Sequence, residues 1–508
     1  MTSIGTHPLS LHDFSTLLAS PSSVVLDESA LAKVEINHQF LKTFAADKLI
    51  YGINTGFGPM AQYKVSDENR EALQYNLIRS HASGGGNLLP AGLVRALTLA
   101  RLVSLMRGYS GVHPDTVRLL ASLLDHGIAP CIYEHGGVGA SGDLIQLAHL
   151  ALVLLGEGEV LVGGEIRPTN NVFRERGIQP LQIHIREGLA ILNGTSAMTG
   201  IGLVNLIQAR KLLDWAILLS ALTNEVVGAY DDSFSDELNR VKYHRGQNEV
   251  AARLRETLRD SGMIRSRTEH LYQPERIDRE VFSEKVQEYY SLRCVTQVLG
   301  PVLDTLEGAE RVLVDELNSV NDNPVIDHEA GNVFHGGNFH GDYVALEMDK
   351  VKIAITKLSM LSERQLNYLL NDKLNGIFPP FLNLGTLGLN FGMQGMQFTA
   401  TSTVAENQTL SFPMYVHSIP NNNDNQDIVS MGCNAALLTK KVIDNAFEVL
   451  AIQAMALAQA VDFLGRAEKL APETGRFYAE IRAIFPCFVE DAPKYGELRR
   501  VREFLEGN

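Results

Sequence analysis

The sequence predicts a mainly α-helical fold, in which a long antiparallel helix bundle follows a loop-rich N-terminal domain. Long amphipathic stretches cover roughly 200 to 228, 284 to 319, 341 to 371 and 429 to 466. These stretches exceed the mean helix length of about 11 to 12 residues and are typical of bundles. In the last stretch the apolar residues advance by alternating steps of four and three, as on a core-facing helix: Ile443, Phe447, Leu450, Ala454, Leu457, Val461 and Leu464.

The N-terminal part is less regular. The first sixty residues mix short polar and apolar segments and end in 51 to 58 (YGINTGFG), which is too rich in glycine for a helix interior and predicts a loop. From about Val94 the pattern is helical, with a break from 108 to 114. The stretch 157 to 167 (EGEVLVGGEIR) predicts a β-hairpin that turns at Gly163 and Gly164.

These patterns divide the chain into three parts. Residues 1–200 form the N-terminal domain, and residues 201–466 form the central long-helix bundle. Residues 467–508 are charged and contain Pro472, Pro486 and Pro493, so we expect a small helical appendage there.

Composition excludes some classes of partner. The chain has 508 residues, of which 45% are hydrophobic and 20% charged, as in an ordinary globular protein. Its net charge of −15 argues against nucleic acid or an anionic membrane as the main partner. Its four cysteines lie far apart without metal-ligand spacing, so we expect reduced thiols. We find no signal-peptide pattern and no uninterrupted apolar run long enough to span a bilayer, and we expect a cytoplasmic protein.

The most informative chemistry lies at Ala140-Ser141-Gly142. If the Gly142 amide nitrogen attacks the Ala140 carbonyl carbon and two waters leave, the product is a five-membered ring with an exocyclic methylidene group. That carbon is a strong electrophile, which natural side chains do not supply. Gly142 lacks a Cβ that would block the attack, Ala140 adds little bulk, and Ser141 can lose its hydroxyl. The alternative for a lone Ala-Ser-Gly is a glycine-rich turn before a helix.

The wider context favours ring formation. Residues 135 to 150 (HGGVGASGDLIQLAHL) resemble the signature of the histidine and aromatic amino acid ammonia-lyase family, in which this triplet cyclises to 4-methylideneimidazole-5-one. The family usually has Pro at the position of Gln146, which lies beyond the triplet on the expected next helix. The resemblance extends over roughly residues 45 to 465 and includes several polar loops in the same order and spacing, one of which is expected at 80 to 86 (SHASGGG).

The resemblance implies roles for residues that are scattered along the sequence. Tyr51 matches the base that removes a β-proton, and since a phenol is mostly protonated at neutral pH, its surroundings must favour the phenolate. Arg293 matches the arginine that pairs with the substrate carboxylate. Asn193 and Tyr290 resemble residues that border the ring and donate hydrogen bonds to it. The remaining pocket positions, implied in the same way, are Ser80, His81, Gln287, Asn323, Phe339, Glu406 and Gln426.

The implied reaction is the elimination of ammonia from a small-molecule amino acid substrate to give a trans α,β-unsaturated acid, without a metal. His335 and His340 are five residues apart and have no nearby carboxylate or thiolate ligands, so we do not expect them to bind a metal. Family members are homotetramers whose active sites combine loops from three subunits, and we expect the same here.

The residues that sort substrates leave two amino acids open. Ser80-His81 is a polar pair, typical of histidine ammonia-lyases, and argues against phenylalanine. Asn425-Gln426-Asp427 argues against histidine, because the histidine enzymes carry Glu after the Gln. The sequence segments 51 to 63 and 335 to 343 resemble those of a bacterial tyrosine ammonia-lyase branch. The expected reaction is therefore L-tyrosine to trans-p-coumarate, with histidine to urocanate as the alternative, and His81 is expected to meet the phenol hydroxyl.

Two further alternatives remain. A tyrosine 2,3-aminomutase shares the electrophile but returns ammonia to the β-carbon. A non-enzymatic helical scaffold is the alternative from another class, and it leaves the polar loops without a purpose.

Overall fold

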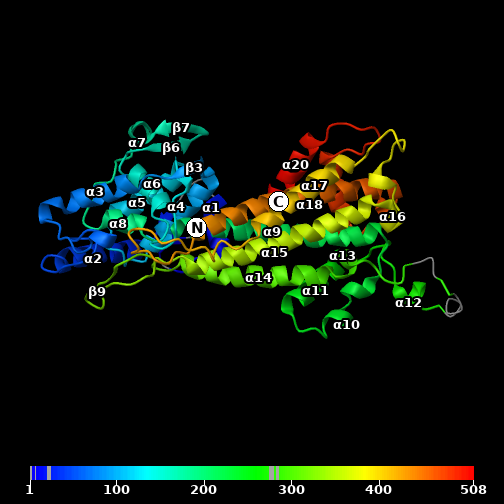
Figure 1. Ribbon diagram of the computed structural model, residues 1–508, viewed down its shortest axis with the longest axis horizontal. Helices are drawn as coiled ribbons and strands as arrows, with labels where there is room; N and C mark the ends of the chain where they lie inside the picture. The colour runs from blue at the N-terminus through cyan, green and yellow to red at the C-terminus, as the bar shows by residue number, and fades with distance from the viewer. Residues whose placement is uncertain (1–2, 6, 20–23, 274–279, 282–284, 508) are drawn as a thin grey trace. The chain divides into compact units, whose positions relative to one another are not determined.

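A computed structural model describes the chain except for residues 1–2, 6, 20–23, 274–279, 282–284 and 508 (Figure 1). The described part is mainly α-helical with short strands, so the predicted fold class is confirmed. Contacts divide it into two compact units. The first comprises Met1–Ile207, Gly308–Asp349 and Pro413–Lys440, and the second comprises Gln208–Glu307, Lys350–Phe412 and Lys441–Asn508. Each unit therefore combines distant segments, whereas the sequence-based division into 1–200, 201–466 and 467–508 follows chain order.

The first unit contains helices α1 to α8 and, among the described residues, every strand. Its helices are α1 (Leu11–Ala19), α2 (Glu28–Phe44), α3 (Arg70–His81), α4 (Ala91–Leu105), α5 (Pro114–Asp125), α6 (Ile145–Leu154), α7 (Thr169–Arg176) and α8 (Glu187–Leu192). Its strands are β1 (Ser3–Ile4), β2 (Val25–Leu26), β3 (Gly85–Leu88), β4 (Ala129–Pro130), β5 (Tyr133–His135), β6 (Glu159–Val162), β7 (Glu165–Pro168), β8 (Val325–Asp327) and β9 (Asn332–Phe334). The predicted hairpin is β6 and β7, which pair antiparallel around Gly163 and Gly164, both in the left-handed region.

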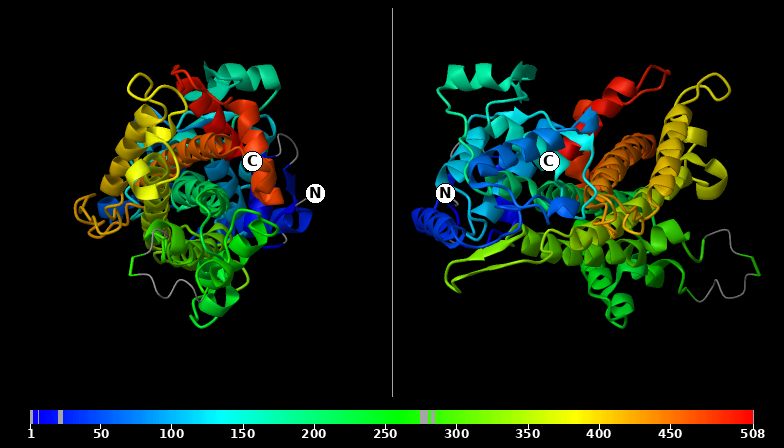
Figure 2. Two further views of the ribbon diagram at one scale, coloured as in Figure 1. Left: turned by 90° about the vertical axis from the view of Figure 1, so that its right-hand side faces the viewer. Right: turned by 60° about the vertical axis from the view of Figure 1, so that its left-hand side comes forward.

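Four long helices have their sequences divided between the units: α9 (Ser196–Val226), α14 (Val295–Leu317), α15 (Asp342–Leu370) and α18 (Gly432–Leu464). The second unit also contains α10 (Asp236–Asn239), α11 (Arg245–Thr257), α12 (Arg267–His270), α13 (Tyr290–Arg293), α16 (Asp372–Asn375), α17 (Gln394–Leu410), α19 (Pro472–Ile484) and α20 (Tyr495–Gly507). Within the second unit, α17 lies beside α15 and α18 (Figure 2), and the buried Asn407 side chain donates to Ser359 Oγ and to the Val442 carbonyl.

The predicted apolar stripe of α18 is confirmed for six of its seven members. Ile443, Phe447, Leu450, Ala454, Leu457 and Val461 are buried, and Leu464 is half-buried at the helix end. By length and composition α18 is apolar enough to cross a membrane, a candidate that the search for an uninterrupted apolar run did not reveal. Most of its apolar window is buried inside the fold, as in the core helix of a globular protein.

One predicted helix begins later than expected. The sequence pattern indicated a helix from 284, which lies outside the described residues, to 319, but the structure has only the single turn α13 before α14 begins at Val295. The Lys285 ammonium explains the difference, because it donates to Tyr368 Oη and to the carbonyls of Leu374 (3.0 Å) and Asn375 (3.4 Å). These tertiary contacts hold the segment before Tyr290 in a non-helical conformation.

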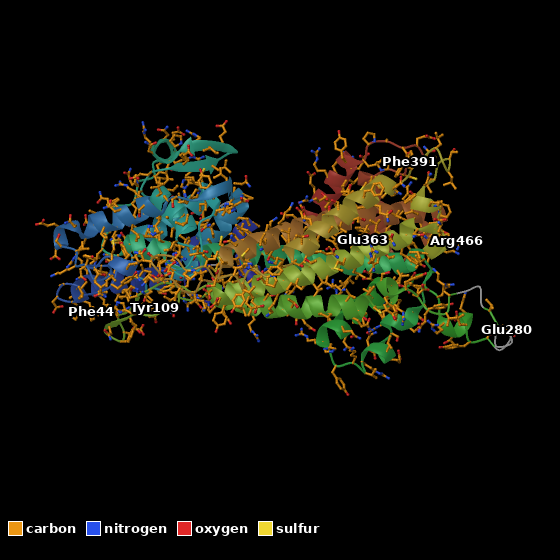
Figure 3. The ribbon with its side chains drawn as sticks, in the orientation of Figure 1. Phe44, Tyr109, Glu280, Glu363, Phe391 and Arg466 are labelled. Carbon is orange, nitrogen blue, oxygen red and sulfur yellow. The ribbon has the colours of Figure 1, made fainter. Side chains whose placement is uncertain are left out.

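The segment that carries Tyr51 is anchored in a small core of the first unit. Ile50 and Ile53 flank Tyr51 and are both buried, and they pack with Leu41 of α2 and Ile326 of β8. Phe44, labelled in Figure 3, covers this cluster from the end of α2. The predicted loop is thus confirmed, and its apolar residues fix the position of the tyrosine between them.

Candidate active site

A cavity of about 730 Å³ in the first unit brings together most of the predicted site. Eight predicted residues line it: Tyr51, Ser80, His81, Ser141, Asn193, Asn323, Phe339 and Gln426. They come from segments up to several hundred residues apart in the sequence, so the fold gathers what the sequence scatters. The wall is completed by residues that the sequence did not single out, among them Phe57, Met60, Leu73, Asn76 and Leu77.

The Ala140-Ser141-Gly142 backbone is bent in a way that requires glycine. Gly142 has a φ of +73°, and a Cβ built there would lie 2.0 Å from the Gly194 carbonyl oxygen. The N–H of Asp143 donates to that same oxygen at 2.8 Å. Ala140 is buried, whereas Ser141 reaches the cavity. Any side chain at position 142 would therefore collide with Gly194, so the structure requires the glycine that the sequence analysis connected with ring closure.

Two amide side chains bind Ser141. Asn193 Nδ2 donates to the Ser141 carbonyl oxygen and Gln426 Nε2 donates to the Ser141 hydroxyl, both at 2.8 Å. These donors contact the carbonyl oxygen that a methylidene-imidazolone ring would carry and the hydroxyl that would leave, and both Ser141 and Gln426 line the cavity. The residues present therefore fit the ring. Among the described residues, no group of three or more His, Cys, Asp or Glu side chains is placed to hold a metal ion.

Asp143 lies directly behind the triplet. Its buried carboxylate accepts hydrogen bonds from the N–H groups of Ala197 (2.7 Å) and Met198 (3.1 Å) in the first turn of α9. Burial raises the pKa of this carboxyl to about 7, although the two N–H donors and the Arg101 charge act in the opposite direction. The group thus changes its charge near neutral pH.

Tyr51 lies in the same cavity as Ser141. Its phenol oxygen accepts a hydrogen bond from the Gly58 N–H at 3.0 Å, and its ring lies nearly perpendicular to that of Phe57, with the ring centres 6.1 Å apart. A backbone N–H can only donate, so this bond is stronger to a phenolate than to a phenol. The arrangement supplies one of the interactions that a tyrosine base requires.

One face of α3 forms a wall of the cavity. Leu73, Asn76, Leu77 and Ser80 recur at steps of three and four and line it together with His81. The sequence placed Ser80 and His81 in a polar loop, but they form the last turn of this helix. The three earlier residues were missed, and stepping back from Ser80 at helical spacing would have found them.

His81 has a defined tautomer in its neutral form. Its Nδ1 lies 2.9 Å from the Leu77 carbonyl oxygen, which can only accept, so Nδ1 carries the proton. Ser80 Oγ, which donates to the same carbonyl, lies 3.0 Å from that nitrogen. The remaining nitrogen, Nε2, is therefore a hydrogen-bond acceptor. This contact orients the ring from within its own helix.

The loop that carries Gln426 has an unusual backbone. Asn422, Asn423 and Asp424 all have φ between 51° and 58°, and two backbone hydrogen bonds between Asn421 and Gln426 close the loop. Asn and Asp tolerate this left-handed region better than most residues, at a cost of about 1 to 2 kcal/mol each. The strain is concentrated beside the cavity that Asn422 and Gln426 line.

Asn193 also holds the part of the cavity wall that contains Asn323 and Gly336. Its Oδ1 accepts the Asn323 N–H, and Asn323 Oδ1 in turn accepts the Gly336 N–H, each at 2.7 Å. His335 lines the cavity next to Gly336, and burial together with the Arg186 charge lowers the pKa of its imidazole. His340 follows His335 by five residues in the sequence, and its Nδ1 lies 3.1 Å from the Asp342 carboxylate.

Four predicted residues lie in the second unit and do not line this cavity. Gln287 and Tyr290 line another cavity of about 560 Å³, and the Arg293 guanidinium lies 4.7 Å from the Tyr290 ring centre. Tyr290 is 72% exposed, which is unusual for so large a ring. Glu406 on α17 accepts from Asn445 Nδ2 at 2.6 Å. These four positions remain predictions from the resemblance.

Comparison with known proteins identifies relatives along nearly the whole chain. Residues 9–483 match the family described as aromatic amino acid lyase. A tyrosine 2,3-aminomutase of Chondromyces crocatus is 39% identical over 506 residues, with 98% of this chain and 95% of the relative covered. A tyrosine ammonia-lyase of Cupriavidus metallidurans is 41% identical over 490 residues (94% and 91%), and a histidine ammonia-lyase of Geobacillus is 38% identical over 502 (99% and 96%).

The fold agrees with this match. The crystal structure of a tyrosine aminomutase from Streptomyces globisporus superposes with a TM-score of 0.96 at 37% identity, and the alignment covers 100% of this chain and 97% of that one. Ammonia-lyases and aminomutases both occur among the relatives. The chemistry common to them is the removal of an amino group from an aromatic amino acid or its transfer within that amino acid. The chain belongs to the aromatic amino acid lyase family.

Proposed function

We propose that the protein is a tyrosine ammonia-lyase that converts L-tyrosine to trans-p-coumarate and ammonia. The observation that carries the proposal is that one cavity holds Ser141, Tyr51 and His81. Ser141 supplies the atoms of an electrophile, Tyr51 is a phenol with a hydrogen-bond donor on its oxygen, and His81 offers an acceptor. These are the groups needed to take an amine, a β-proton and a phenol hydroxyl.

The electrophile is proposed to be 4-methylideneimidazole-5-one, formed from Ala140-Ser141-Gly142 without another protein. When formed, it supplies an electron-poor methylidene carbon that takes up the substrate amine and makes it a better leaving group. Asn193 Nδ2, which donates to the Ser141 carbonyl oxygen, is placed to stabilise negative charge at that oxygen. Gln426 holds the hydroxyl that must leave.

Tyr51 is proposed to remove the β-proton of the substrate. The Gly58 N–H stabilises the phenolate that this role requires, and the buried neighbours Ile50 and Ile53 fix the position of the residue. General base catalysis of this kind contributes about 10²- to 10⁴-fold to the rate.

His81 is proposed to select tyrosine. A phenol hydroxyl donates a hydrogen bond, and the neutral His81 ring presents Nε2 as the acceptor because its Nδ1–H donates to the Leu77 carbonyl oxygen. Phenylalanine leaves this acceptor unpaired and is therefore disfavoured. Leu73 and Leu77 offer apolar contact to the substrate ring from the same helix face.

Arg293, Tyr290, Gln287 and Glu406 enter the proposal through an oligomer. We propose a cytoplasmic homotetramer in which these residues complete the cavity of another copy of the chain. The exposed Tyr290 ring, with Arg293 against its face, suits a surface that becomes covered on assembly. Arg293 then pairs with the carboxylate of the substrate.

Two other reactions deserve a test because of the relatives. Several relatives are named tyrosine 2,3-aminomutase. The aminomutase reaction uses the same electrophile but returns ammonia to the β-carbon of the substrate instead of releasing it. Others are named histidine ammonia-lyase, and the polar Ser80-His81 pair is compatible with an imidazole substrate. Against histidine stands Asp427 after Gln426, where the histidine enzymes have a longer carboxylate.

The deciding experiment supplies the purified protein with L-tyrosine, L-histidine or L-phenylalanine in separate reactions. Chromatography and absorbance then follow p-coumarate, urocanate, cinnamate and β-tyrosine, with Ser141→Ala as the control for background. We expect p-coumarate as the main product. Accumulation of β-tyrosine would identify an aminomutase instead, and urocanate a histidine enzyme.

A further inference from the structure

Arg101 on α4 is a fully buried cation behind the triplet, and neither its spacing nor its neighbours in sequence mark it as functional. Its guanidinium donates in several directions. Nη1 donates to Asn321 Oδ1 at 2.9 Å and to Ser196 Oγ at 3.3 Å. Nη2 donates to the carbonyl oxygens of Asn193 (2.9 Å) and Ala190. One side chain thus ties together three segments of the first unit.

The segment on which these bonds converge presses on the triplet. Asn193 and Gly194 form the turn between α8 and α9, and the Asn193 side chain donates to the Ser141 carbonyl. The Gly194 carbonyl accepts from Asp143 and lies where a Gly142 Cβ would be. Gly194 itself has no room for a side chain, because a Cβ there would lie 2.4 Å from Arg101 Nη1. The order of contact is therefore Arg101, the turn, and then the triplet.

The Arg101 charge persists at neutral pH. Burial lowers the pKa of the guanidinium to about 10, and the charge of Arg186 acts in the same direction. The carboxylates of Asp322 and Asp143 act against both. A protonated guanidinium offers rigid, planar donors on both sides, which a lysine ammonium does not reproduce.

Ring closure makes a strict demand on this geometry. The Gly142 nitrogen must bond to the Ala140 carbonyl carbon. The carbonyl oxygen then leaves as water with the two amide hydrogens of Ser141 and Gly142, and the Ser141 hydroxyl leaves as a second water with its Cα hydrogen. No oxidant or reductant is needed. What the fold must supply is close approach of one backbone nitrogen to a carbon that it does not normally touch, and positioning of this kind governs the rate of such reactions.

We propose that Arg101 is the positioning residue for ring formation: it clamps the Asn193–Gly194 turn onto the triplet and so forces the Gly142 nitrogen toward the Ala140 carbon. The inference rests on the proposed electrophile. It assigns Arg101 no contact with the substrate, and its signature is the yield and rate of the ring rather than a property of the finished site.

The test compares Arg101→Met and Arg101→Lys with Arg186→Met and Arg186→Lys. Arg186 is the matched control because it is an equally buried arginine of the same unit. It is paired with Asp322 at 3.2 Å and donates to the Pro324 carbonyl. Among the contacts of the described residues, it has no hydrogen bond to the Asn193–Gly194 turn. Intact-protein mass spectrometry and near-ultraviolet absorbance measure the ring-bearing fraction in freshly folded protein over time. Circular dichroism and gel filtration establish that each variant is folded.

We expect freshly folded Arg101→Met to have the uncyclised mass, which still includes both waters. It should then form the ring about 100-fold more slowly than the wild type, because misplacing reacting groups by about 1 Å has an effect of about that size. Folded Arg186 variants should form the ring much faster than the matching Arg101 variants, because Arg186 reaches the Asn193 side chain only through Asn323, whose neighbours Asp322 and Pro324 it binds. Equal slowing in both sets of variants would overturn the proposal, because the loss of either buried arginine would then have the same effect. If Arg101→Met does not fold, Arg101→Lys decides, because it keeps volume and charge and loses only the forked donors. Ring formation at the wild-type rate in folded Arg101→Lys or Arg101→Met overturns the proposal. Absence of the ring from the wild type itself would instead refute the proposed function.

Discussion

The Gly58 N–H donates a hydrogen bond to the phenol oxygen of Tyr51 at 3.0 Å. This bond joins two residues of one glycine-rich loop, and Gly58 adopts a φ of +52° to make it. A Cβ at Gly58 would lie 2.7 Å from the Asn422 side chain, so the loop that carries Gln426 packs directly against the donor. The position of the proposed base and the hydrogen bond to its phenol oxygen therefore depend on the packing of these two loops.

Removal of the base should separate ring formation from turnover. In Tyr51→Phe we expect kcat to fall by about 10²- to 10⁴-fold, the range for loss of a general base, while the mass shows the ring formed as in the wild type. Gly58→Ala should reduce kcat in the same direction by straining the donor. Wild-type turnover in Tyr51→Phe would assign proton removal to another residue.

Ser141→Ala removes the hydroxyl whose loss creates the methylidene carbon. We expect activity with tyrosine, histidine and phenylalanine to disappear together, because each reaction needs the electrophile. Intact-protein mass spectrometry should then find this variant at its full, uncyclised mass. Residual activity above that of a protein-free blank would mean that Ser141 is not the source of the electrophile.

His81→Phe tests the proposed recognition of the phenol. Loss of a hydrogen bond from a polar group that the bound substrate covers costs about 1 to 3 kcal/mol, so we expect the ratio of kcat/KM for tyrosine over phenylalanine to fall by about 5- to 150-fold. His126→Phe is the control, since His126 is exposed at the end of α5 and does not line the cavity. An unchanged ratio in His81→Phe would remove His81 from substrate selection and leave the electrophile untouched.

The proposed sharing of sites between subunits predicts complementation. Ser141→Ala and Arg293→Ala should each be inactive alone. Co-expressed, they should recover about a quarter of the wild-type activity, because random assembly of a symmetric oligomer gives each site an intact Ser141 and an intact Arg293 with a probability of about one half each. If both residues of a site came from one chain, the mixed oligomer would stay inactive.

Local patterns in the sequence predicted those elements whose conformation is decided locally. The stripe from Ile443 to Val461 repeats at helical spacing and is buried as expected. Gly163 and Gly164 mark a two-residue hairpin turn because both need a positive φ. By contrast, Lys285 is bonded to Tyr368 and to carbonyls nearly ninety residues away, and these bonds end the helical pattern before Tyr290. No local signal contains that information.

The site was predictable to the extent that its residues carry unusual chemistry. Ser141 and Tyr51 lie in distinctive glycine-rich sequence segments, and both line one cavity in the structure. Leu73 and Leu77 are ordinary helix residues whose role appears only once α3 is seen against that cavity. Arg101 shows the same limit, since an arginine in an apolar helix reads as a surface residue until its buried partners are known.

Asp143 gives the stability of the fold a pH dependence of unusual sign. Burial raises the pKa of its carboxyl from 3.8 to about 7, so between these pH values the folded chain holds a proton that the unfolded chain has released. The stability that Asp143 contributes is therefore fully present below about 4 and is lost as the pH rises through about 7. Most paired carboxylates do the opposite.

Asp143→Asn isolates this effect, because asparagine is uncharged throughout and keeps an oxygen that can accept from Ala197 or Met198. We expect the melting temperature of the wild type, relative to that of Asp143→Asn, to fall between pH 4 and pH 7 and to level off above. Taking the difference cancels every other titrating group. A difference that rises over the same range would mean that the N–H donors of α9 and the Arg101 charge outweigh burial, so that the carboxylate is the favoured form in the folded chain.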